Sequence, residues 1–478
     1  MYRVVRIVFL LFLFYKGNLS TECTKRKYEF SSFVCVCDEN HCNFDGISNA
    51  NLDSNNVRII KSSKDEFRNF EEILPRQDGT FNISDDEISI YINSNNRRQE
   101  VIGFGGAFTD AATMNIKSLS KKAQDNLLKM YFTKEGSQYN LVRVPIAGCD
   151  FSTHPYSYDD VEGDVDLVHF NLTIEDYEYK LPLIKQAIGL CSKDLYILTS
   201  PWSPPAWMKT SKTFNGSGEL LPEMWQPYSN YLVKFFQMYE EILGTNLWGF
   251  TPQNEPLSGL EPDWPFNCCG WTAEKMRDWI ANVLGPTLSA AGYRRLKLLI
   301  DDYNRETLPS YIIPIVDDPK AEQYVDGIAV HWYNDLKVGP EVLDQTHEAA
   351  PGKFILYTEA CVESASNPIA LGSWERGERY ITNIIETANE FYVQPLYYAL
   401  SHFSRNIERG ATWISSSLDT DIDDLKVTAL ENPNGQIVVV VANVAEDPYQ
   451  IRIVNESKDT IFRHTIEGKT WLTITYQK

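Results

Sequence analysis

Short apolar segments alternate with amphipathic stretches through the middle of this chain, and this alternation restricts the fold more than any other feature of the sequence. The segments have the length and composition of β-strands and cover residues 99–104, 139–145, 194–201, 247–252, 296–302, 327–332 and 354–359. The stretches between them, such as 121–131, 228–243 and 273–284, have helical periodicity. Regular alternation of strands and helices is typical of a parallel sheet covered by helices, and it predicts an α/β fold of the (β/α)8 barrel type.

The number of predicted strands is one short of a closed barrel, which needs eight. After residue 359 no eighth strand-like segment follows, because residues 379–404 have the apolar spacing of helices. A barrel without its eighth strand has two unpaired sheet edges and an opening to its core. We therefore expect a barrel that lacks strand 8.

The pattern changes to short alternating strands from residue 412 onward. These strands, at 425–430, 437–442, 450–454, 461–465 and 471–476, together with 56–61 and 87–92, favour a β-sandwich built from both chain ends. The predicted organisation is a signal peptide at 1–20, a disulfide-bonded segment at 21–45, a β-sandwich domain of 46–95 plus 411–478, and a barrel domain of 96–410.

The N-terminus is typical of a secretory signal. Arg3 and Arg6 precede an apolar stretch at 7–15 that is too short to span a membrane. Cleavage near residue 20 would leave a luminal or extracellular protein. Four cysteines then follow closely, and in a secreted chain they favour two disulfides over the alternative of a zinc site: Cys23, Cys35, Cys37 and Cys42. Sequons predict glycosylation in the same route, at Asn82, Asn171, Asn215 and Asn455.

The net charge of −21 argues against nucleic acid as a partner, because the chain has no excess of cations to neutralise phosphates. It also argues against simple electrostatic docking on anionic lipid. An acidic lumen would protonate part of the acidic excess and relieve self-repulsion, which is compatible with a lysosome.

Two glutamates, Glu255 and Glu359, each stand where a buried strand-like segment ends. A carboxylate is costly to bury unless it is paired or catalytic, and the C-terminal strand ends of a barrel meet at one pocket. Two carboxylates that face each other across such a pocket are typical of glycoside hydrolysis, with one acid/base and one nucleophile. From the spacing alone, the alternative is that both are salt-bridge partners.

Motifs along nearly the whole chain resemble the glucosylceramidases of the glycoside hydrolase 30 family. They are GFGGAFTDAA at 103–112, YNLVRVPIAGCDFS at 139–152, SPWSPPAWMKT at 200–210, TPQNEP at 251–256, PFNCCGW at 265–271, GIAVHWY at 327–333, TEACV at 358–362 and LGSWERG at 371–377. The resemblance implies a TIM barrel with a β-sandwich. Family members carry an eighth strand with a pocket tryptophan after the LGSWERG-like segment and its helix. This chain passes from 381–385 almost directly to 391–395, so a deletion lies near 386–391.

The resemblance also implies a retaining β-glucosidase that needs no cofactor and acts on glucosylceramide. It makes Glu255 the acid/base and Glu359 the nucleophile, so activity is expected to peak below neutral pH. It places seven residues around the substrate: Arg143, Asp150, Trp202, Asn254, Trp264, His331 and Tyr333. It pairs Cys23 with Cys35 and Cys37 with Cys42. The partners it implies are glucosylceramide at a membrane surface, a saposin-type lipid activator and anionic lipid, in the lysosome or outside the cell.

Simpler interpretations exist for several of these residues. His331 could be a core histidine with satisfied hydrogen bonds, and Asp150 could be a turn or cap residue. Trp264 stands where the family usually has tyrosine, and we interpret it as a rim aromatic. Cys361 is interpreted as a packed free thiol, and the adjacent Cys268 and Cys269 are not expected to bond to each other. For the whole chain, the alternatives are a β-glycosidase with another aglycone and a catalytically impaired binding partner of an active homologue.

Overall fold

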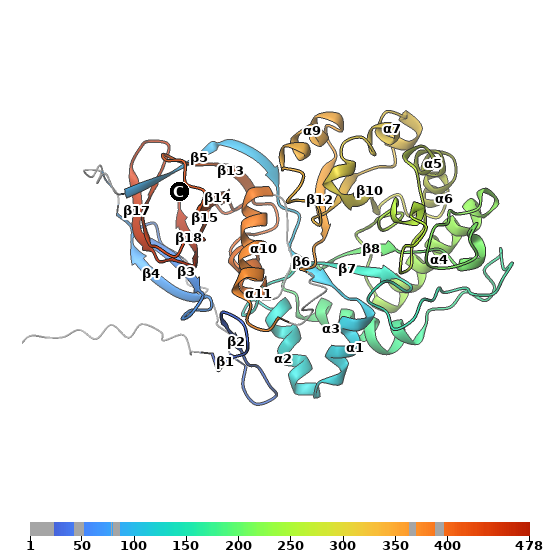
Figure 1. The fold of residues 1–478 in the computed structure, drawn as a ribbon, viewed down its shortest axis with the longest axis horizontal. Helices are drawn as coiled ribbons and strands as arrows, with labels where there is room; N and C mark the ends of the chain where they lie inside the picture. The colour runs from blue at the N-terminus through green and yellow to red at the C-terminus, as the bar shows by residue number, and fades with distance from the viewer. Residues whose placement is uncertain (1–22, 43–51, 78, 80–86, 363–369, 388–395) are drawn as a thin grey trace, which may run out of the picture.

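The computed structural model describes residues 23–42, 52–77, 79, 87–362, 370–387 and 396–478. The predicted signal peptide at 1–20 and the sequon at Asn82 lie outside the described residues. The chain forms a barrel domain, which stands on the right in Figure 1, and a β-sheet domain on the left that contains both the early and the late strands.

The barrel domain contains a curled sheet of seven parallel strands whose order in the sheet follows their order in the chain. The strands are β6 (Gly105–Ala107), β7 (Leu141–Ile146), β8 (Tyr196–Pro201), β9 (Gly249–Phe250), β10 (Lys297–Asn304), β11 (Gly327–His331) and β12 (Phe354–Glu359). Among the described residues no eighth strand joins β12 to β6. The seven strands agree with the predicted number, and the predicted deletion near 386–391 lies mostly outside the described residues.

Eleven α-helices lie within the described residues, most of them on the outside of the barrel (Figure 1). They are α1 (Asp110–Ser118), α2 (Lys121–Phe132), α3 (Leu181–Leu190), α4 (Trp225–Leu243), α5 (Ala273–Trp279), α6 (Gly285–Ala290), α7 (Ile313–Val316), α8 (Pro319–Glu322), α9 (Glu341–Ala349), α10 (Trp374–Thr387) and α11 (Leu396–Ser404). Side-chain hydrogen bonds and backbone conformation at the helix ends determine where some of these helices begin or end. The Thr109 hydroxyl accepts from the first turn of α1, and Gly244, at φ 70°, ends α4. No described helix combines the length and apolarity that crossing a membrane requires.

The first barrel strand was predicted wrongly at 99–104. Residues 99 and 100 instead end β5 (Glu87–Glu100), which stays paired with β13 (Thr412–Leu418) through two register shifts. The barrel strand begins later, at Gly105, where a Cβ would come within 1.5 Å of the Leu141 carbonyl oxygen. Only glycine allows this close approach between β6 and β7. The strand-like residues near position 100 therefore belong to a strand of the β-sheet domain and not to the barrel.

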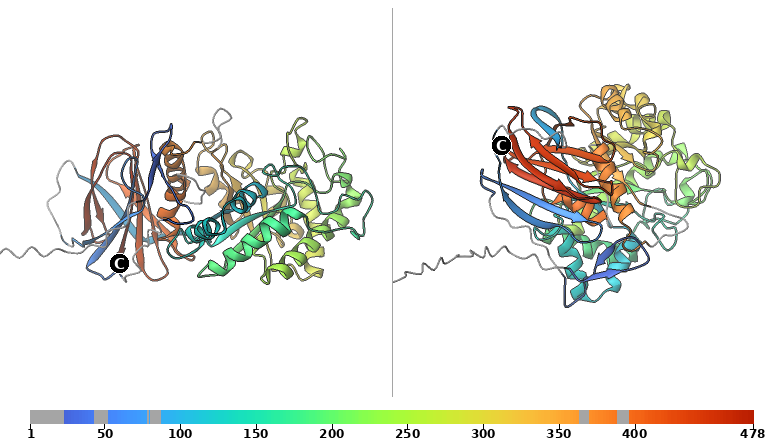
Figure 2. Two further views of the ribbon diagram at one scale, coloured as in Figure 1. Left: turned by 90° about the horizontal axis from the view of Figure 1, so that it is seen from below. Right: turned by 60° about the vertical axis from the view of Figure 1, so that its left-hand side comes forward.

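The second domain is a nine-stranded sheet in the order β17-β16-β5-β13-β14-β15-β18-β3-β4, antiparallel except where β16 meets β5. Its further strands are β3 (Asn56–Ser63), β4 (Phe70–Pro75), β14 (Leu425–Glu431), β15 (Gln436–Asn443), β16 (Tyr449–Val454), β17 (Thr460–Ile466) and β18 (Thr470–Gln477). The early and late strands lie side by side in Figure 2, as predicted. Successive residues of β15 alternate between two cores: Val439 and Val441 lie inside the β-domain, whereas Val438 and Val440 join the core shared with the barrel.

Helices α10 and α11 lie between the two domains (Figures 1 and 2). On the β11–β12 side, Tyr380 of α10 packs edge-on against Trp332 and donates to the carbonyl of Ala360. On the opposite side, Tyr397 of α11 donates to the carbonyl of Met130 in α2 at 3.0 Å. The helix pair thus contacts the ends of β11 and β12 on one side and helix α2 on the other through aromatic side chains.

The N-terminal segment forms a small hairpin of β1 (Lys25–Lys27) and β2 (Phe33–Cys35). Its disulfides join Cys23 to Cys35 and Cys37 to Cys42, as the resemblance implied. Cys268, Cys269 and Cys361 form no disulfide.

Candidate active site

The predicted catalytic residues meet at the C-terminal ends of neighbouring barrel strands. Glu359 is the last residue of β12 and His331 the last of β11, whereas Glu255 lies in the loop after β9. One side-chain ligand atom from each of these three residues lies within 4.8 Å of the others. The structure thus brings together three residues that are 104 positions apart at the extremes, as the barrel topology predicts.

Glu359 is held by two donors. The Arg143 guanidinium donates to Oε2 at 2.5 Å, and the Tyr333 hydroxyl donates to Oε1 at 2.7 Å. Burial alone would raise the pKa of Glu359, but the nearby positive charges of His331 and Arg143 hold it below its usual value. Glu359 therefore stays ionised in mild acid, as a nucleophile must.

Glu255 has a different environment. The Ser258 hydroxyl donates to its Oε2 at 3.1 Å, and His331 Nδ1 lies 3.2 Å from its Oε1. Its backbone N–H donates to the carbonyl of Asp302 at 3.0 Å, which ties the loop to the end of β10. Its φ of 47° lies in the left-handed region. Asp302 shares this conformation at φ 52°, so two non-glycine residues hold strained backbone at the site.

His331 is fully buried between two acids, because its Nδ1 faces Glu255 and its Nε2 lies 3.2 Å from Asp302 Oδ1. Burial would lower the pKa of His331, but Glu359, Asp302 and Glu255 together raise it to about 10. The imidazole is therefore charged and donates through both nitrogens. The interpretation as a core histidine is right about burial but omits this electrostatic role.

The three-residue cluster has the ligand types of a metal site, yet its chemistry does not fit one. A metal needs a neutral imidazole with a free lone pair. Both nitrogens of His331 are directed at carboxylates, and their protons are stabilised by those charges. The site chemistry is that of paired carboxylates with a bridging cation.

Asp302 is the one central residue that the sequence reasoning missed. Its carboxylate accepts from four side chains: Arg143 Nη2 at 2.8 Å, Thr251 at 2.7 Å, Thr358 at 2.6 Å and His331. Burial would raise the pKa of Asp302, but Arg143 and His331 hold it far below its usual range. Asp302 ends a segment that was predicted as a strand, so the criterion applied to the two glutamates would also have found it.

Most other predicted substrate residues line the same site. Arg143 Nη2 also donates to Asn254 Oδ1 at 2.8 Å, and its guanidinium lies 4.8 Å from the Trp202 ring centre. Burial, followed by the charge of Glu359, raises the pKa of Asp150 to about 7, which is consistent with a position near Glu359. Trp264 lies farther along the loop after β9 and packs edge-on against Phe266. It is partly exposed, and none of its described contacts is with the two glutamates.

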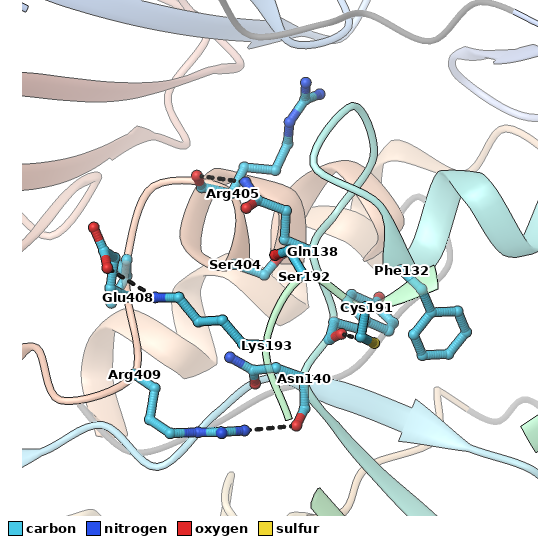
Figure 3. A pocket seen from close by; sticks show the side chains of 12 residues that line it. Phe132, Gln138, Asn140, Cys191, Ser192, Lys193, Ser404, Arg405, Glu408 and Arg409 are labelled. Atoms are coloured by element: carbon cyan, nitrogen blue, oxygen red, sulfur yellow. Dashed lines mark hydrogen bonds and ion pairs between the residues drawn. The ribbon is translucent and has the colours of Figure 1, made fainter. Parts of the chain in front are cut away.

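A separate cavity of about 50 Å³ lies near the opposite end of the barrel strands, between α3, the start of β7 and the segment after α11 (Figure 3). Two of its charged side chains have partners within the lining. Lys193 contacts Glu408 at 2.8 Å, and Arg409 donates to the Asn140 carbonyl at 2.7 Å. Burial raises the pKa of the Cys191 thiol to about 12, so this thiol is not activated. The cavity is a polar packing seam and contains none of the predicted site residues.

Comparison with known families gives two matches that follow the two domains. Residues 101–390 match the Glycosyl hydrolase family 30 TIM-barrel domain, and residues 410–474 match the Glycosyl hydrolase family 30 beta sandwich domain.

Full-length relatives have similar sequences. "Putative glucosylceramidase 4" of Caenorhabditis elegans is 34% identical over 98% of this chain and 98% of its own. That alignment runs over 518 positions, 40 more than the 478 residues of this chain, so at least 40 positions fall opposite gaps here. Mouse lysosomal acid glucosylceramidase is 34% identical over 90% of this chain and 91% of its own. An endo-1,6-beta-D-glucanase of Neurospora crassa is 26% identical, with 80% of this chain and 84% of its own covered.

Solved structures support the fold. SrfJ of Salmonella typhimurium superposes with a TM-score of 0.79 at 23% identity, covering 88% of this chain and all of its own.

Proposed function

Because the chain belongs to glycosyl hydrolase family 30, we propose that it is a retaining β-glucosidase that hydrolyses glucosylceramide to glucose and ceramide. The separation of the two glutamates carries this proposal, since one oxygen of Glu255 and one of Glu359 lie within 4.8 Å. Carboxyl groups about 5–5.5 Å apart suit a covalent intermediate, whereas inverting enzymes need roughly 6.5–9.5 Å to fit a water. The short separation favours retention.

In the first step, Glu359 forms a bond to the anomeric carbon while the bond to the ceramide oxygen breaks. Glu255 gives its proton to that departing oxygen. Arg143 and Tyr333 support this step, because they hold both oxygens of Glu359 and so fix the direction of attack. The charges of Arg143 and His331 hold the pKa of Glu359 below its usual value, which keeps the nucleophile ionised in mild acid.

In the second step, Glu255 takes a proton from water as the water oxygen attacks the anomeric carbon. The ester bond to Glu359 breaks, the carboxylate returns, and glucose leaves with Glu255 protonated again. Asn254 suits the sugar 2-hydroxyl in both steps, because Arg143 holds its amide oxygen and no described residue accepts from its NH₂ group. This contact strengthens as positive charge develops on the ring.

The location and partners form part of the same proposal. The two disulfides, and the exposure of the sequon residues Asn171 and Asn215, suit a protein that passes through the secretory route. The lysosomal mouse relative favours a lysosome as the destination, with glucosylceramide presented at a membrane surface and a saposin-type activator as helper. Activity is then expected to peak below neutral pH.

The second candidate is a catalytically impaired homologue that acts as a binding partner. The described part of the chain forms no eighth barrel strand, which favours this candidate because such a strand would close one wall of the sugar pocket. Retention of the complete Arg143, Asp302, His331 and Tyr333 arrangement around both glutamates favours the enzyme.

Turnover decides between these candidates. The secreted chain should release fluorophore from a fluorogenic β-glucoside and ceramide from glucosylceramide in detergent, and Glu359→Gln should abolish both. A β-1,6-glucan serves as the competing substrate, because the endo-1,6-beta-D-glucanase of Neurospora crassa is also similar to this chain in sequence. No turnover of either glucoside by a folded wild-type chain would favour the binding partner, and turnover of the glucan alone would overturn the lipid substrate.

A further inference from the structure

Glu255, the proposed acid/base, is contacted on both of its carboxylate oxygens, by residues from two different parts of the barrel. His331 Nδ1 lies 3.2 Å from Oε1, and the Ser258 hydroxyl donates to Oε2 at 3.1 Å. His331 ends β11, whereas Ser258 belongs to the same loop as Glu255. Ser258 is not among the residues that the sequence predicted for the site, so its contact with Oε2 needs an explanation of its own.

The two oxygens of Glu255 differ in what they can carry. The imidazole of His331 is charged and directs an N–H at Oε1. A second proton on Oε1 would point at that N–H, so the proton that Glu255 transfers must lie on Oε2. Ser258 contacts this same oxygen. Its hydroxyl can donate to Oε2 in both forms of the acid, because a protonated carboxyl oxygen keeps acceptor capacity.

The backbone around Ser258 fixes the position of its hydroxyl. The Ser258 N–H donates to the Glu255 carbonyl at 3.0 Å, which closes a four-residue turn with Pro256 at its second position. The Trp271 N–H donates to the Pro256 carbonyl at 2.8 Å, so the turn is bound to the segment before α5. Ser258 is 1% exposed. The turn therefore directs a buried hydroxyl back at the carboxylate three residues earlier.

Gly259 binds the turn closely to two further segments. A Cβ at this position would come within 2.1 Å of the Gly270 nitrogen, so only glycine allows the loop to pack this closely. The Gly259 carbonyl also accepts from the Gly218 N–H at 2.8 Å. Ser258 is thus followed by a residue with no room to move, which makes its hydroxyl a fixed donor.

We propose that Ser258 is a positioning residue for proton transfer, because its hydroxyl holds Oε2 of Glu255 in the orientation from which the proton reaches the departing oxygen. The inference rests on the proposed function, since it requires Glu255 to be the acid/base. Contacts on both oxygens restrict rotation of the carboxylate about its Cγ–Cδ bond, and a misplacement of about 1 Å can cost on the order of 100-fold in rate. The same orientation serves the second step, in which Glu255 takes a proton from water.

The test compares Ser258→Ala with the wild type of the complete secreted chain, on two glucosides that differ in their leaving group. Octyl β-glucoside has a poor leaving group and needs the acid, whereas 2,4-dinitrophenyl β-glucoside needs none. Ser258→Ala should lower kcat/KM about 10–100-fold for the octyl glucoside and by less than about 2-fold for the dinitrophenyl glucoside. As the matched control, Ser229→Ala removes a buried serine hydroxyl that donates to the Trp225 carbonyl in α4, and it should leave both values unchanged.

Trapping with a 2,4-dinitrophenyl 2-deoxy-2-fluoro glucoside measures the two steps separately. Ser258→Ala should form the ester on Glu359 at the wild-type rate, which also shows that the variant is folded. It should hydrolyse the ester about 10-fold more slowly, because Glu255 is then out of position as a base. Azide needs no base, so it should speed release of the sugar from Ser258→Ala but not from the wild type.

The outcomes separate this inference from the proposed function. An equal fall in kcat/KM for both glucosides, or an unchanged value for the octyl glucoside, would overturn the role of Ser258 and leave the proposed function standing. A folded wild type that turns over neither glucoside would refute the proposed function and this inference together, because Glu255 would then transfer no proton.

Discussion

Replacing Asp302 by asparagine should destabilise the protein strongly, whereas the same change at its neighbour Asp301 should not. The two aspartates have the same size, are both buried, and both have positive φ, at 52° and 77°. Asparagine tolerates that backbone conformation, so neither substitution adds backbone strain. The two residues differ in their partners: Asp302 accepts from Arg143 and His331, whereas Asp301 accepts from the neutral hydroxyl of Thr307.

The expected magnitude follows from the lost ion pairs. Removing one partner of a buried charge pair costs about 3–5 kcal/mol, because the remaining charges stay buried without compensation. A chain of this length has an unfolding entropy of roughly 1 kcal/mol per kelvin, so Asp302→Asn should lower Tm by about 3–5 °C. For Asp301, burial raises the pKa well above its usual value, so the folded state disfavours the charged carboxylate. Asparagine removes that carboxylate, and Tm should stay level or rise.

The pH dependence separates the two changes further. The folded-state pKa of Asp302 is lowered, so its contribution is present above the unfolded value of about 3.9 and is lost only as pH falls through the folded value. The Asp302→Asn deficit should therefore persist from pH 7 down to about pH 4. The folded-state pKa of Asp301 is raised, so its neutral form is favoured below about pH 3.9 and is costly at pH 7. Any gain from Asp301→Asn should shrink towards pH 4.

Thermal unfolding of both variants beside the wild type, at pH 7 and pH 4.5, measures these effects. Glucosidase turnover gives a second readout, since Asp302 also positions Arg143 and His331, and activity should fall in Asp302→Asn alone. Variants that melt within about 1 °C of each other would show that the assignment of charge to Asp302 and not to Asp301 is wrong.

Three further predictions concern the site and the barrel. A 2-deoxy-2-fluoro glucoside should leave a stable ester on the peptide that contains Glu359, and a label found elsewhere by mass spectrometry would refute this nucleophile. The pKa of His331 is raised to about 10, so its stabilisation is present below about pH 6.5 and is lost as pH rises through 10. The Tm deficit of His331→Gln should accordingly be largest in mild acid and shrink above pH 9, and a constant deficit would contradict this charge. Finally, a family-like insert after Ile385 that restores an eighth strand should raise Tm and turnover, since each buried unsatisfied main-chain group costs about 1–3 kcal/mol. If the chain without the insert has the same Tm and turnover, α10 and α11 replace the strand adequately.

Much of this architecture could be predicted from the sequence, because hydrophobic alternation and strand ends are local signals. Both glutamates were located by their position after apolar segments, and six of the seven predicted barrel segments overlap a barrel strand. The network around Asp302 could not be predicted in the same way, because its partners come from four separate strands and loops and only the curled sheet brings them together. The misplaced first strand has a similar cause, since the pairing of β5 with β13 joins residues more than 300 positions apart.

The α10–α11 pair has a consequence for how the protein unfolds. Trp374 of α10 stacks on Trp471 of the β-domain at 4.0 Å between ring centres, and His402 of α11 contacts Thr473 at 2.8 Å. The same helices contact the barrel, and one apolar core runs from the barrel through the helices into one face of the β-domain. We therefore expect the two domains to unfold as a single cooperative unit. Calorimetry should show one transition, and the β-domain should not fold when expressed without the barrel.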